Sequence, residues 1–256
     1  MRVERKPFTC RRGDFTIHGF VYQSPVSNRI PVIMSHAFLF NQRIMRKYAE
    51  AFAKAGYVVF TYDFCGGALL GKSDGKFRDM SIDTEVADLK AVIAYVEQAG
   101  GVDLSRLVLL GASQGGFVSC LVAAEYQDRI SKLVLLYPAL CIPDDARTGR
   151  MLMIRFDPAH IRETMVSRPF RFSAQYPESA IRIDTYAEIQ KIKIPMLILH
   201  GTADRIVDLD YARKAEAVFT NPASRLLVMD KAQHGFTPRQ VRTAIRQMLD
   251  FLRDTP

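Results

Sequence analysis

The 256-residue sequence lacks any apolar run long enough to span a membrane, and no apolar signal core follows its charged N-terminal residues. These absences lead us to expect a cytoplasmic protein without a membrane partner. The four cysteines are widely spaced and form no C-x-x-C pair. They therefore favour reduced, buried thiols over a disulfide framework or a zinc site, and we expect neither a metal nor another cofactor.

Long basic runs are also missing. The formal net charge is +8, but lysine and arginine are scattered among acidic residues, and no basic run is longer than two residues, as at Arg11-Arg12. A basic charge can serve anionic substrates or nucleic acid. The scattered arrangement instead favours a solvated basic surface, so we expect no nucleic-acid partner.

The sequence does contain a regular alternation of short apolar runs with helical patterns. With 48% hydrophobic residues, the chain can bury a substantial core in one domain spanning residues 1–256. The alternation predicts an α/β fold with a mostly parallel sheet. Strands are expected at 15–22, 31–34, 57–62, 107–110, 133–137, 196–200 and 226–229, and helices at 42–55, 81–99, 115–126 and 241–252.

Residues 141–194 interrupt this alternation. Prolines are mixed there with methionines and aromatic residues, without a clear period. A long irregular insertion in a compact domain is usually functional, which favours a lid over the site. A peripheral packing element is the alternative, because methionine and aromatic side chains would be buried in either case.

The strongest functional signal is a serine motif. Residues 111–115 read GASQG and directly follow the apolar run 107–110. The G-x-S-x-G pattern is typical of a nucleophile elbow, in which a serine stands on a tight turn between a strand and a helix. Such a serine needs a base to accept its proton and a carboxylate to orient that base.

A base and a carboxylate are available at the ends of two later strands. Asp204 and His234 each follow a separate predicted strand, in the chain order Ser, Asp, His that this motif requires. We therefore predict a catalytic triad of Ser113, Asp204 and His234. Asp210 is better explained as a helix cap, and His200 as a structural residue that bonds the loop backbone.

The tetrahedral intermediate of acyl transfer needs two hydrogen-bond donors for its oxyanion. One is expected from the residue after the nucleophile, which is Gln114, through its backbone N–H. The other is expected from the loop that follows the strand at 31–34, where Phe38 supplies the backbone N–H.

Several segments together resemble the α/β-hydrolase superfamily over nearly the full length and, within it, the bacterial cinnamoyl (feruloyl) esterases. The resemblance implies an eight-stranded, mostly parallel sheet flanked by helices, with an inserted lid. The segments are HAF at 36–38 with Asn41, DF at 63–64, KSDGKF at 72–77, SQGG at 113–116, the insertion at 141–194 and HGTAD at 200–204.

The resemblance also implies two substrate contacts in the lid. In that group a lid aspartate and a lid tyrosine hydrogen-bond the phenolic hydroxyls of the substrate, and the corresponding positions are Asp145 and Tyr176. A solvated loop acid and a tyrosine buried by lid packing are the alternatives. Two departures bear on the substrate. Ala37 replaces a usual glycine and would be strained at positive φ, and the loop 65–71 is longer than usual and could narrow the mouth of the site.

Together these features predict a serine carboxylesterase that cleaves a small-molecule ester through an acyl-enzyme. Hydroxycinnamate esters of the feruloyl or chlorogenate type are the class that the resemblance implies. A short-acyl esterase, a monoacylglycerol lipase or a thioesterase would use the same triad, since apolar pockets discriminate by only about 1–3 kcal/mol per methylene. A non-catalytic binding protein of this fold is a further alternative. The oligomeric state stays open, and a homodimer is compatible with the sequence.

Overall fold

The computed structural model of the chain describes residues 2–254, and its centre is a sheet of eight strands. The strands lie in the order β1-β2-β4-β3-β5-β6-β11-β12. β1 and β2 form an antiparallel hairpin, β2 pairs antiparallel with β4, and the remaining pairs are parallel. The prediction of a mostly parallel sheet is therefore confirmed. The bounds are β1 (Glu4–Arg12), β2 (Phe15–Gln23), β3 (Pro31–Ser35), β4 (Val58–Tyr62), β5 (Val108–Ala112), β6 (Lys132–Leu136), β11 (Met196–Gly201) and β12 (Arg225–Met229).

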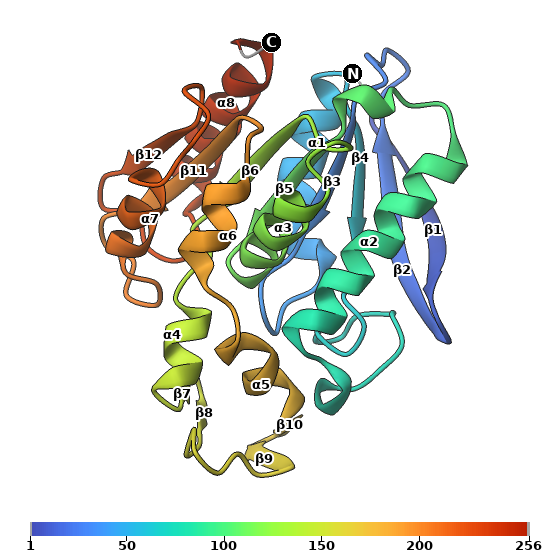
Figure 1. Ribbon diagram of the computed structural model, residues 1–256. Helices are drawn as coiled ribbons and strands as arrows, with labels where there is room; N and C mark the ends of the chain where they lie inside the picture. Colours follow the sequence, from blue (N-terminus) through green and yellow to red (C-terminus); the bar gives the residue numbers. More distant parts are fainter. Residues whose placement is uncertain (1, 255–256) are drawn as a thin grey trace.

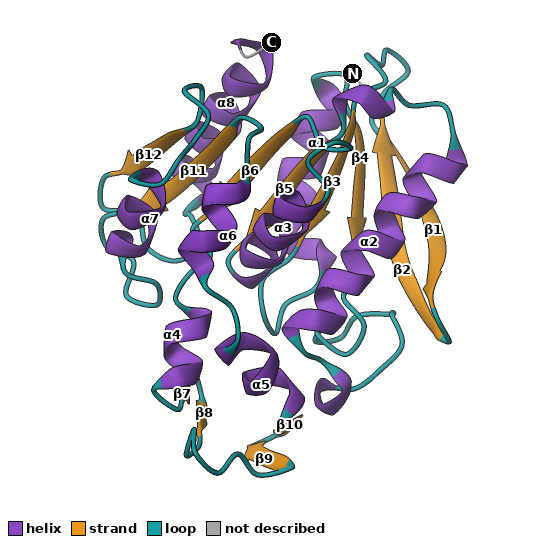
Figure 2. Cartoon of the chain, viewed as in Figure 1, coloured by secondary structure: helices purple, strands orange, loops and turns teal. Residues whose placement is uncertain are grey.

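Helices cover both faces of this sheet (Figure 2). On one face lie α2 (Ile82–Ala99), α3 (Gln114–Glu125), α6 (Thr185–Lys191) and α7 (Leu209–Glu216), and on the other lie α1 (Arg46–Lys54) and α8 (Pro238–Asp254). Neighbouring side chains of one strand point to opposite faces of the sheet and pack in two different apolar layers. Ile33 packs with the first layer, whereas Val32 and Met34 pack with the second. Burial on both faces explains why the central strands read as unbroken apolar runs.

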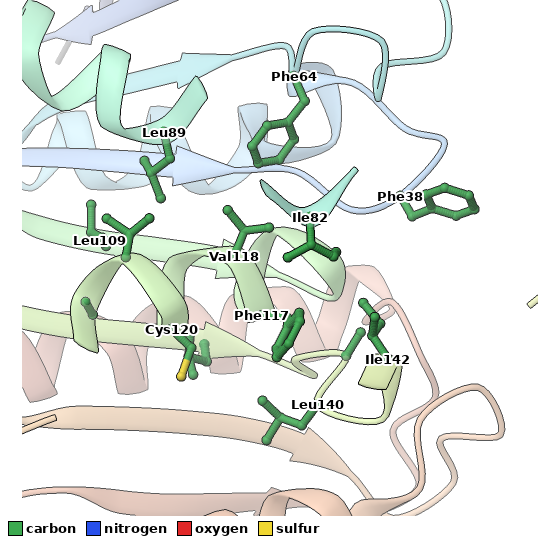
Figure 3. Packing of buried hydrophobic residues seen from close by; sticks show 14 of the residues in the cluster. Phe38, Phe64, Ile82, Leu89, Leu109, Phe117, Val118, Cys120, Leu140 and Ile142 are labelled. Atoms are coloured by element: carbon green, nitrogen blue, oxygen red, sulfur yellow. The ribbon is translucent and has the colours of Figure 1, made fainter. Parts of the chain in front are cut away.

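The first layer holds much of the apolar packing next to the serine motif. Figure 3 shows Phe117, Val118 and Cys120 of α3 in this layer, together with Ile82 of α2 and Leu109 of β5. All five side chains are at most 1% exposed. The helix that follows the serine is therefore held between the sheet and α2, which fixes the position of its N-terminus.

Short helical turns complete the elements outside the insertion. The helix expected at 42–55 is divided into a 3-10 turn, Gln42–Met45, and α1, and it stops before Gly56, whose φ is +102°. α2 begins after Ser81, whose side chain caps the helix by accepting from the Thr84 amide. Two further 3-10 turns lie at Phe77–Asp79 and Leu104–Arg106.

The insertion leaves the sheet after β6 and returns before β11. Figures 1 and 2 show α4, α5 and two small hairpins below the sheet, beyond the carboxyl end of β6, while α6 returns to pack on α3. The elements are α4 (Ile142–Arg147), β7 (Arg150–Met151), β8 (Ile154–Arg155), β9 (Thr164–Ser167), β10 (Phe170–Ser173) and α5 (Gln175–Ile181). The insertion thus contributes short regular elements at the end of the sheet where Ser113 lies.

Candidate active site

Ser113 stands on a tight turn between β5 and α3. Its backbone has φ +52° and ψ −120°, an unfavourable conformation for a residue with a side chain. The flanking glycines make the turn possible. A Cβ at Gly111 would lie 2.2 Å from the carbonyl oxygen of Gly115, and a Cβ at Gly115 would lie 2.3 Å from that of His36. Both positions exclude any side chain, which gives the physical reason for the G-x-S-x-G pattern.

A chain of hydrogen bonds connects Ser113 with the two residues predicted beside it. His234 Nε2 lies 2.9 Å from Ser113 Oγ, and His234 Nδ1 lies 2.8 Å from Asp204 Oδ2. Ser113 is 8% exposed, and the Asp204 carboxylate is fully buried. The structure therefore brings together the nucleophile, base and acid that the sequence predicted at the ends of three different strands.

Asp204 is held in its ionised form. Burial by itself would raise the pKa of this carboxyl, but hydrogen bonds from His200, His234 and the amides of Val207 and Ile206 outweigh burial and lower the pKa well below its usual range. A permanent carboxylate favours the tautomer of His234 that carries its proton on Nδ1. Nε2 is then free to accept a proton from Ser113. His200 Nε2 also lies 3.0 Å from the Val207 carbonyl oxygen, in the structural position expected for it.

Two backbone amides lie beside the serine without acceptors. Neither the Phe38 nor the Gln114 amide has a hydrogen-bond acceptor among residues 2–254. Both residues are buried, with exposed fractions of 7% and 2%. Buried amides without acceptors are rare and costly, so they are available for an oxyanion. Gln114 also begins α3, where the helix dipole adds positive potential.

Ala37 does not strain the loop that carries Phe38. Among the described residues of this loop, Leu39 takes a positive φ of +60°, and Ala37 does not. The Phe40 amide closes the turn by donating to the Ala37 carbonyl at 3.1 Å. The expected strain at position 37 is therefore absent, because the loop reverses two residues later.

A small cavity opens beside Ser113 and includes both predicted lid contacts. Asp145 from α4 and Tyr176 from α5 line it, and the Tyr176 ring stacks on Phe38 with ring centres 5.6 Å apart. The cavity volume is about 30 Å³, room for about two water molecules. An ester with a bulky acyl group therefore enters only if the cavity walls move. The lining residues are Phe38, Ser113, Gln114, Ala139, Cys141, Ile142, Asp145, Met151, Leu152, Tyr176, Ile206 and Val207.

The loop 65–71 was expected to narrow the mouth of the site, but none of its residues lines this cavity. The loop is fastened to the neighbouring one, since Asn41 Nδ2 donates to the Leu69 carbonyl at 2.8 Å and the Leu69 amide donates to the Phe40 carbonyl. The loop 65–71 therefore contacts the loop that carries Phe38 rather than the cavity.

Asp145 and its neighbour Asp144 have different surroundings. Asp144 pairs with Arg147 and accepts from the Tyr211 hydroxyl at the surface. Asp145 is half-buried in the cavity wall, and burial raises the pKa of its carboxyl. The alternative of a solvated acid therefore fits Asp144 and does not fit Asp145.

A buried acid behind Ser113 was missed in the sequence. Tyr176 Oη donates to Gln114 Oε1 at 2.5 Å, and Gln114 Nε2 donates to Glu85 Oε2 at 2.8 Å. Glu85 is 1% exposed, and burial raises its pKa from 4.5 to about 8. The sequence does contain a signal for this buried acid, because Glu85 lies at helical spacing from Ile82 and Leu89 and so on the buried face of α2. This chain of bonds fixes the side chain of Gln114.

Glu85 predicts a specific pH dependence of stability. The folded chain keeps this carboxyl protonated between pH 4.5 and about 8, whereas the unfolded chain loses the proton near pH 4.5. The unfolded state therefore binds fewer protons in this window, and stability falls as pH rises through it. We expect Glu85→Gln to raise the free energy of unfolding by about 2–4 kcal/mol at pH 8 and by little at pH 5.

Denaturant unfolding at both pH values measures this difference. Glu97→Gln is the matched control, because Glu97 lies on the same helix but is partly exposed in an ion pair with Arg129. An equal effect of Glu85→Gln at pH 5 and pH 8 would contradict the protonated state of Glu85.

The described part of the chain offers neither a metal centre nor a membrane-spanning helix. No group of His, Cys, Asp or Glu side chains there could hold a metal ion. No helix within residues 2–254 has both the length and the apolar character needed to cross a membrane.

Comparison with known proteins identifies the family to which the chain is similar. A family model described as serine aminopeptidase, S33 matches residues 27–183. The chain is 24% identical over 230 residues to the AB hydrolase superfamily protein YisY of Bacillus subtilis, an alignment covering 77% of this chain and 82% of that protein.

Solved structures of two esterases share the fold of this chain over nearly its full length. Est1E from Butyrivibrio proteoclasticus with ferulic acid bound superposes with a TM-score of 0.86 at 25% identity, covering 94% of this chain and 97% of that one. The esterase Pf2001 of Pyrococcus furiosus superposes with a TM-score of 0.77 at 21% identity, covering 98% and 92%. The second likeness is one of fold alone.

Proposed function

The chain belongs to the serine aminopeptidase S33 family of α/β-hydrolases, and from this we propose that it is a serine carboxylesterase that forms an acyl-enzyme on Ser113. The observation that carries the proposal is the hydrogen-bond chain from Ser113 through His234 to Asp204 beside two amides without acceptors. A binding protein has no need of this arrangement.

We also propose that the protein acts in the cytoplasm. Its four cysteines are free thiols and three of them are buried, which suits a reducing compartment.

The proposed reaction has two steps. Ser113 Oγ attacks the ester carbonyl while His234 Nε2 accepts the serine proton, and the amides of Phe38 and Gln114 bind the oxyanion. His234 then donates the proton to the leaving alcohol, which leaves the acyl group on Ser113. A water molecule, deprotonated by His234, attacks this acyl-enzyme. Collapse of the second intermediate returns the proton to Ser113 and releases the acid.

We propose hydroxycinnamate esters as the substrate class. The likeness to Est1E, whose structure holds ferulic acid, supports this choice. The cavity beside Ser113 adds physical support, since the stacked rings of Phe38 and Tyr176 suit a planar acyl group. Asp145 can accept a hydrogen bond from a phenol. The Tyr176 hydroxyl already donates to Gln114, so it can accept one as well.

The size of the same cavity favours a second candidate. Room for about two water molecules suits a short acyl group without movement of the walls. A short-acyl esterase, or a monoacylglycerol lipase or thioesterase with the same triad, is therefore the alternative. Rates on ethyl ferulate, a short nitrophenyl ester, a short thioester and a monoacylglycerol distinguish these functions. A preference for ethyl ferulate supports the first proposal, and a preference for an aliphatic substrate contradicts it.

The phenol contact gives a sharper test of the substrate class. Ethyl ferulate and ethyl cinnamate differ in whether the ring carries a phenol, so the ratio of their kcat/KM values reports that contact. We expect Asp145→Asn to lower the ratio about 10- to 100-fold, because a hydrogen bond to a charged group contributes about 1.5–3 kcal/mol. Tyr176→Phe, which removes a neutral partner, should lower it about 3- to 10-fold.

Asp144→Asn is the matched control, since it removes the same charge one residue away but outside the cavity. The ratio should not change in this variant. If Asp145→Asn and Asp144→Asn behave alike, the phenol contact is wrong, and the hydroxycinnamate proposal loses its structural support.

A further inference from the structure

A second and larger cavity lies beside His234. Its volume is about 460 Å³, and it is lined by His234 and Ala37 but not by Ser113. Ile206 lines both cavities, so the two meet at the site. We call this second cavity the alcohol groove. Its walls include Phe40 and Ile206, which are 54% and 53% exposed, although large apolar side chains are usually buried.

The position of the groove assigns it to the leaving group. In the proposed reaction, the acyl group stays on Ser113, in the first cavity, and the alcohol takes its proton from His234. The alcohol must therefore depart past the His234 ring, whose centre lies 4.8 Å from that of the Tyr137 ring in the wall of the groove. The groove is thus where an alcohol larger than methanol would lie before it is released.

The charged side chains that line the groove are both positive. Arg43 and Lys47 line it, and no aspartate or glutamate does. Neither side chain has a hydrogen bond or an ion pair with any residue in the described range 2–254. Arg46, between them in sequence, does pair with Glu50 at 2.7 Å. The two cations on the groove are therefore free to bind an anion.

The spacing of these two cations is unfavourable for the isolated helix. Arg43, in the 3-10 turn Gln42–Met45, and Lys47, in the first turn of α1, are four residues apart on one continuous helical stretch, where like charges at about this spacing repel each other. Neither side chain has an ion-pair partner among residues 2–254 that would offset this repulsion. An anionic group between the two side chains would offset it, and the apolar walls would cover the rest of the same molecule.

From this arrangement we propose that the physiological substrate is an ester whose alcohol part carries a carboxylate, bound by Arg43 and Lys47. This inference rests on the proposed esterase function and adds the chemistry of the leaving group to it. The acyl part and the alcohol part would then be selected in two different cavities, the first beside Ser113 under the insertion and the second beside His234 at the 3-10 turn and the start of α1.

A matched pair of substrates tests the inference whatever the acyl preference. In 3-(butanoyloxy)benzoate the leaving phenol carries a carboxylate, and in its methyl ester the same phenol is neutral. The ratio of the two kcat/KM values for release of butanoate isolates the effect of the anion. We expect the wild-type protein to favour the anionic ester by about 5- to 20-fold, since each exposed ion pair contributes at most about 1 kcal/mol.

Variants then assign this preference to residues. Arg43→Gln with Lys47→Gln should lower the ratio to near that of free solution, and each single change should lower it part of the way. Arg46→Gln is the matched control, because it removes the same charge from the same helix but outside the groove. The ratio in this variant should equal that of the wild type. Raising the salt from about 0.05 M to about 0.5 M should lower the wild-type ratio and leave that of the double variant unchanged.

The contrary outcomes are distinguishable. A protein that cleaves both esters with no preference for the anion, or one in which Arg46→Gln lowers the ratio as much as the double change, overturns this inference alone. A protein that cleaves neither of these esters, nor any in the substrate panel, overturns the proposed function and this inference with it.

Discussion

Replacement of Ser113 by alanine is expected to lower kcat for the best ester substrate by about 10⁴- to 10⁶-fold. The expectation follows from the loss of the atom that forms the acyl-enzyme, since neither His234 nor the two amides can take its place. The fold should persist, because within residues 2–254 the Ser113 hydroxyl hydrogen-bonds only to His234. Initial rates across substrate concentrations measure the loss, and circular dichroism checks the fold.

Ser119→Ala is the control for this experiment. Ser119 is a fully buried serine on the same helix, α3, where its hydroxyl donates to the Gly115 carbonyl at 2.7 Å. It contacts neither cavity. We expect this variant to keep kcat within about 3-fold, whatever stability it loses from the missing hydrogen bond of about 1 kcal/mol. Retention of more than a hundredth of the activity by Ser113→Ala would contradict the nucleophile assignment.

Asp204→Asn is expected to lower kcat by about 10⁴-fold with little change in fold. Oδ1 of Asp204 accepts from the amides of Ile206 and Val207, so an asparagine oxygen should keep this side of the group. Its amide nitrogen then replaces Oδ2 and points a donor at His234 Nδ1. His234 must carry its proton on Nε2 in response, and it can no longer accept the Ser113 proton.

Asp210→Asn is the matched control, because it makes the same change at an exposed acid six residues away, paired with Arg213. Its kcat should match that of the wild type. Comparison of the two variants also separates the local effect on His234 from the effect of net charge, since each change removes one negative charge from the protein. If Asp204→Asn kept a tenth or more of the activity, the role given to its carboxylate would be wrong.

The position of the site could be predicted from the sequence because strands in this fold are short, apolar and buried on both faces. The runs at 107–110, 196–200 and 226–229 locate the ends of β5, β11 and β12, and chemically suitable residues follow each end. Parallel strands bring their carboxyl ends to one edge, so three distant residues meet there. Their catalytic roles are what the two variants above test.

Other features depend on contacts that no local pattern reveals. β1 escaped prediction because it is an edge strand with a mostly exposed, charged sequence, and its Pro7 is tolerated only at such an edge. The turn at Leu39 was missed because a leucine at positive φ has no sequence signal, and the packing of the loop imposes it. The glycine pattern of the family pointed instead to Ala37, where no strain is found.

Glu85 and the insertion could not be predicted either, because their structure depends on residues far away in the sequence or on elements too short to show a period. The burial of Glu85 depends on Gln114 and Tyr176, which lie 29 and 91 residues further along the chain, so the acid on the α2 stripe could not be interpreted alone. The elements of the insertion are two to seven residues long. Segments of this length show no period, which is why residues 141–194 read as irregular.

The most direct test of the central claim is the site of covalent labelling by a fluorophosphonate, read by intact-mass and peptide mass spectrometry. The reagent reacts with a serine only when a base activates it, and its product imitates the acyl-enzyme. We expect one phosphonyl group per chain, on the peptide that contains Ser113. We also expect no label in Ser113→Ala and slow labelling in Asp204→Asn. An unlabelled wild-type protein, or a label on any residue other than Ser113, would contradict the assignment of Ser113 as the nucleophile.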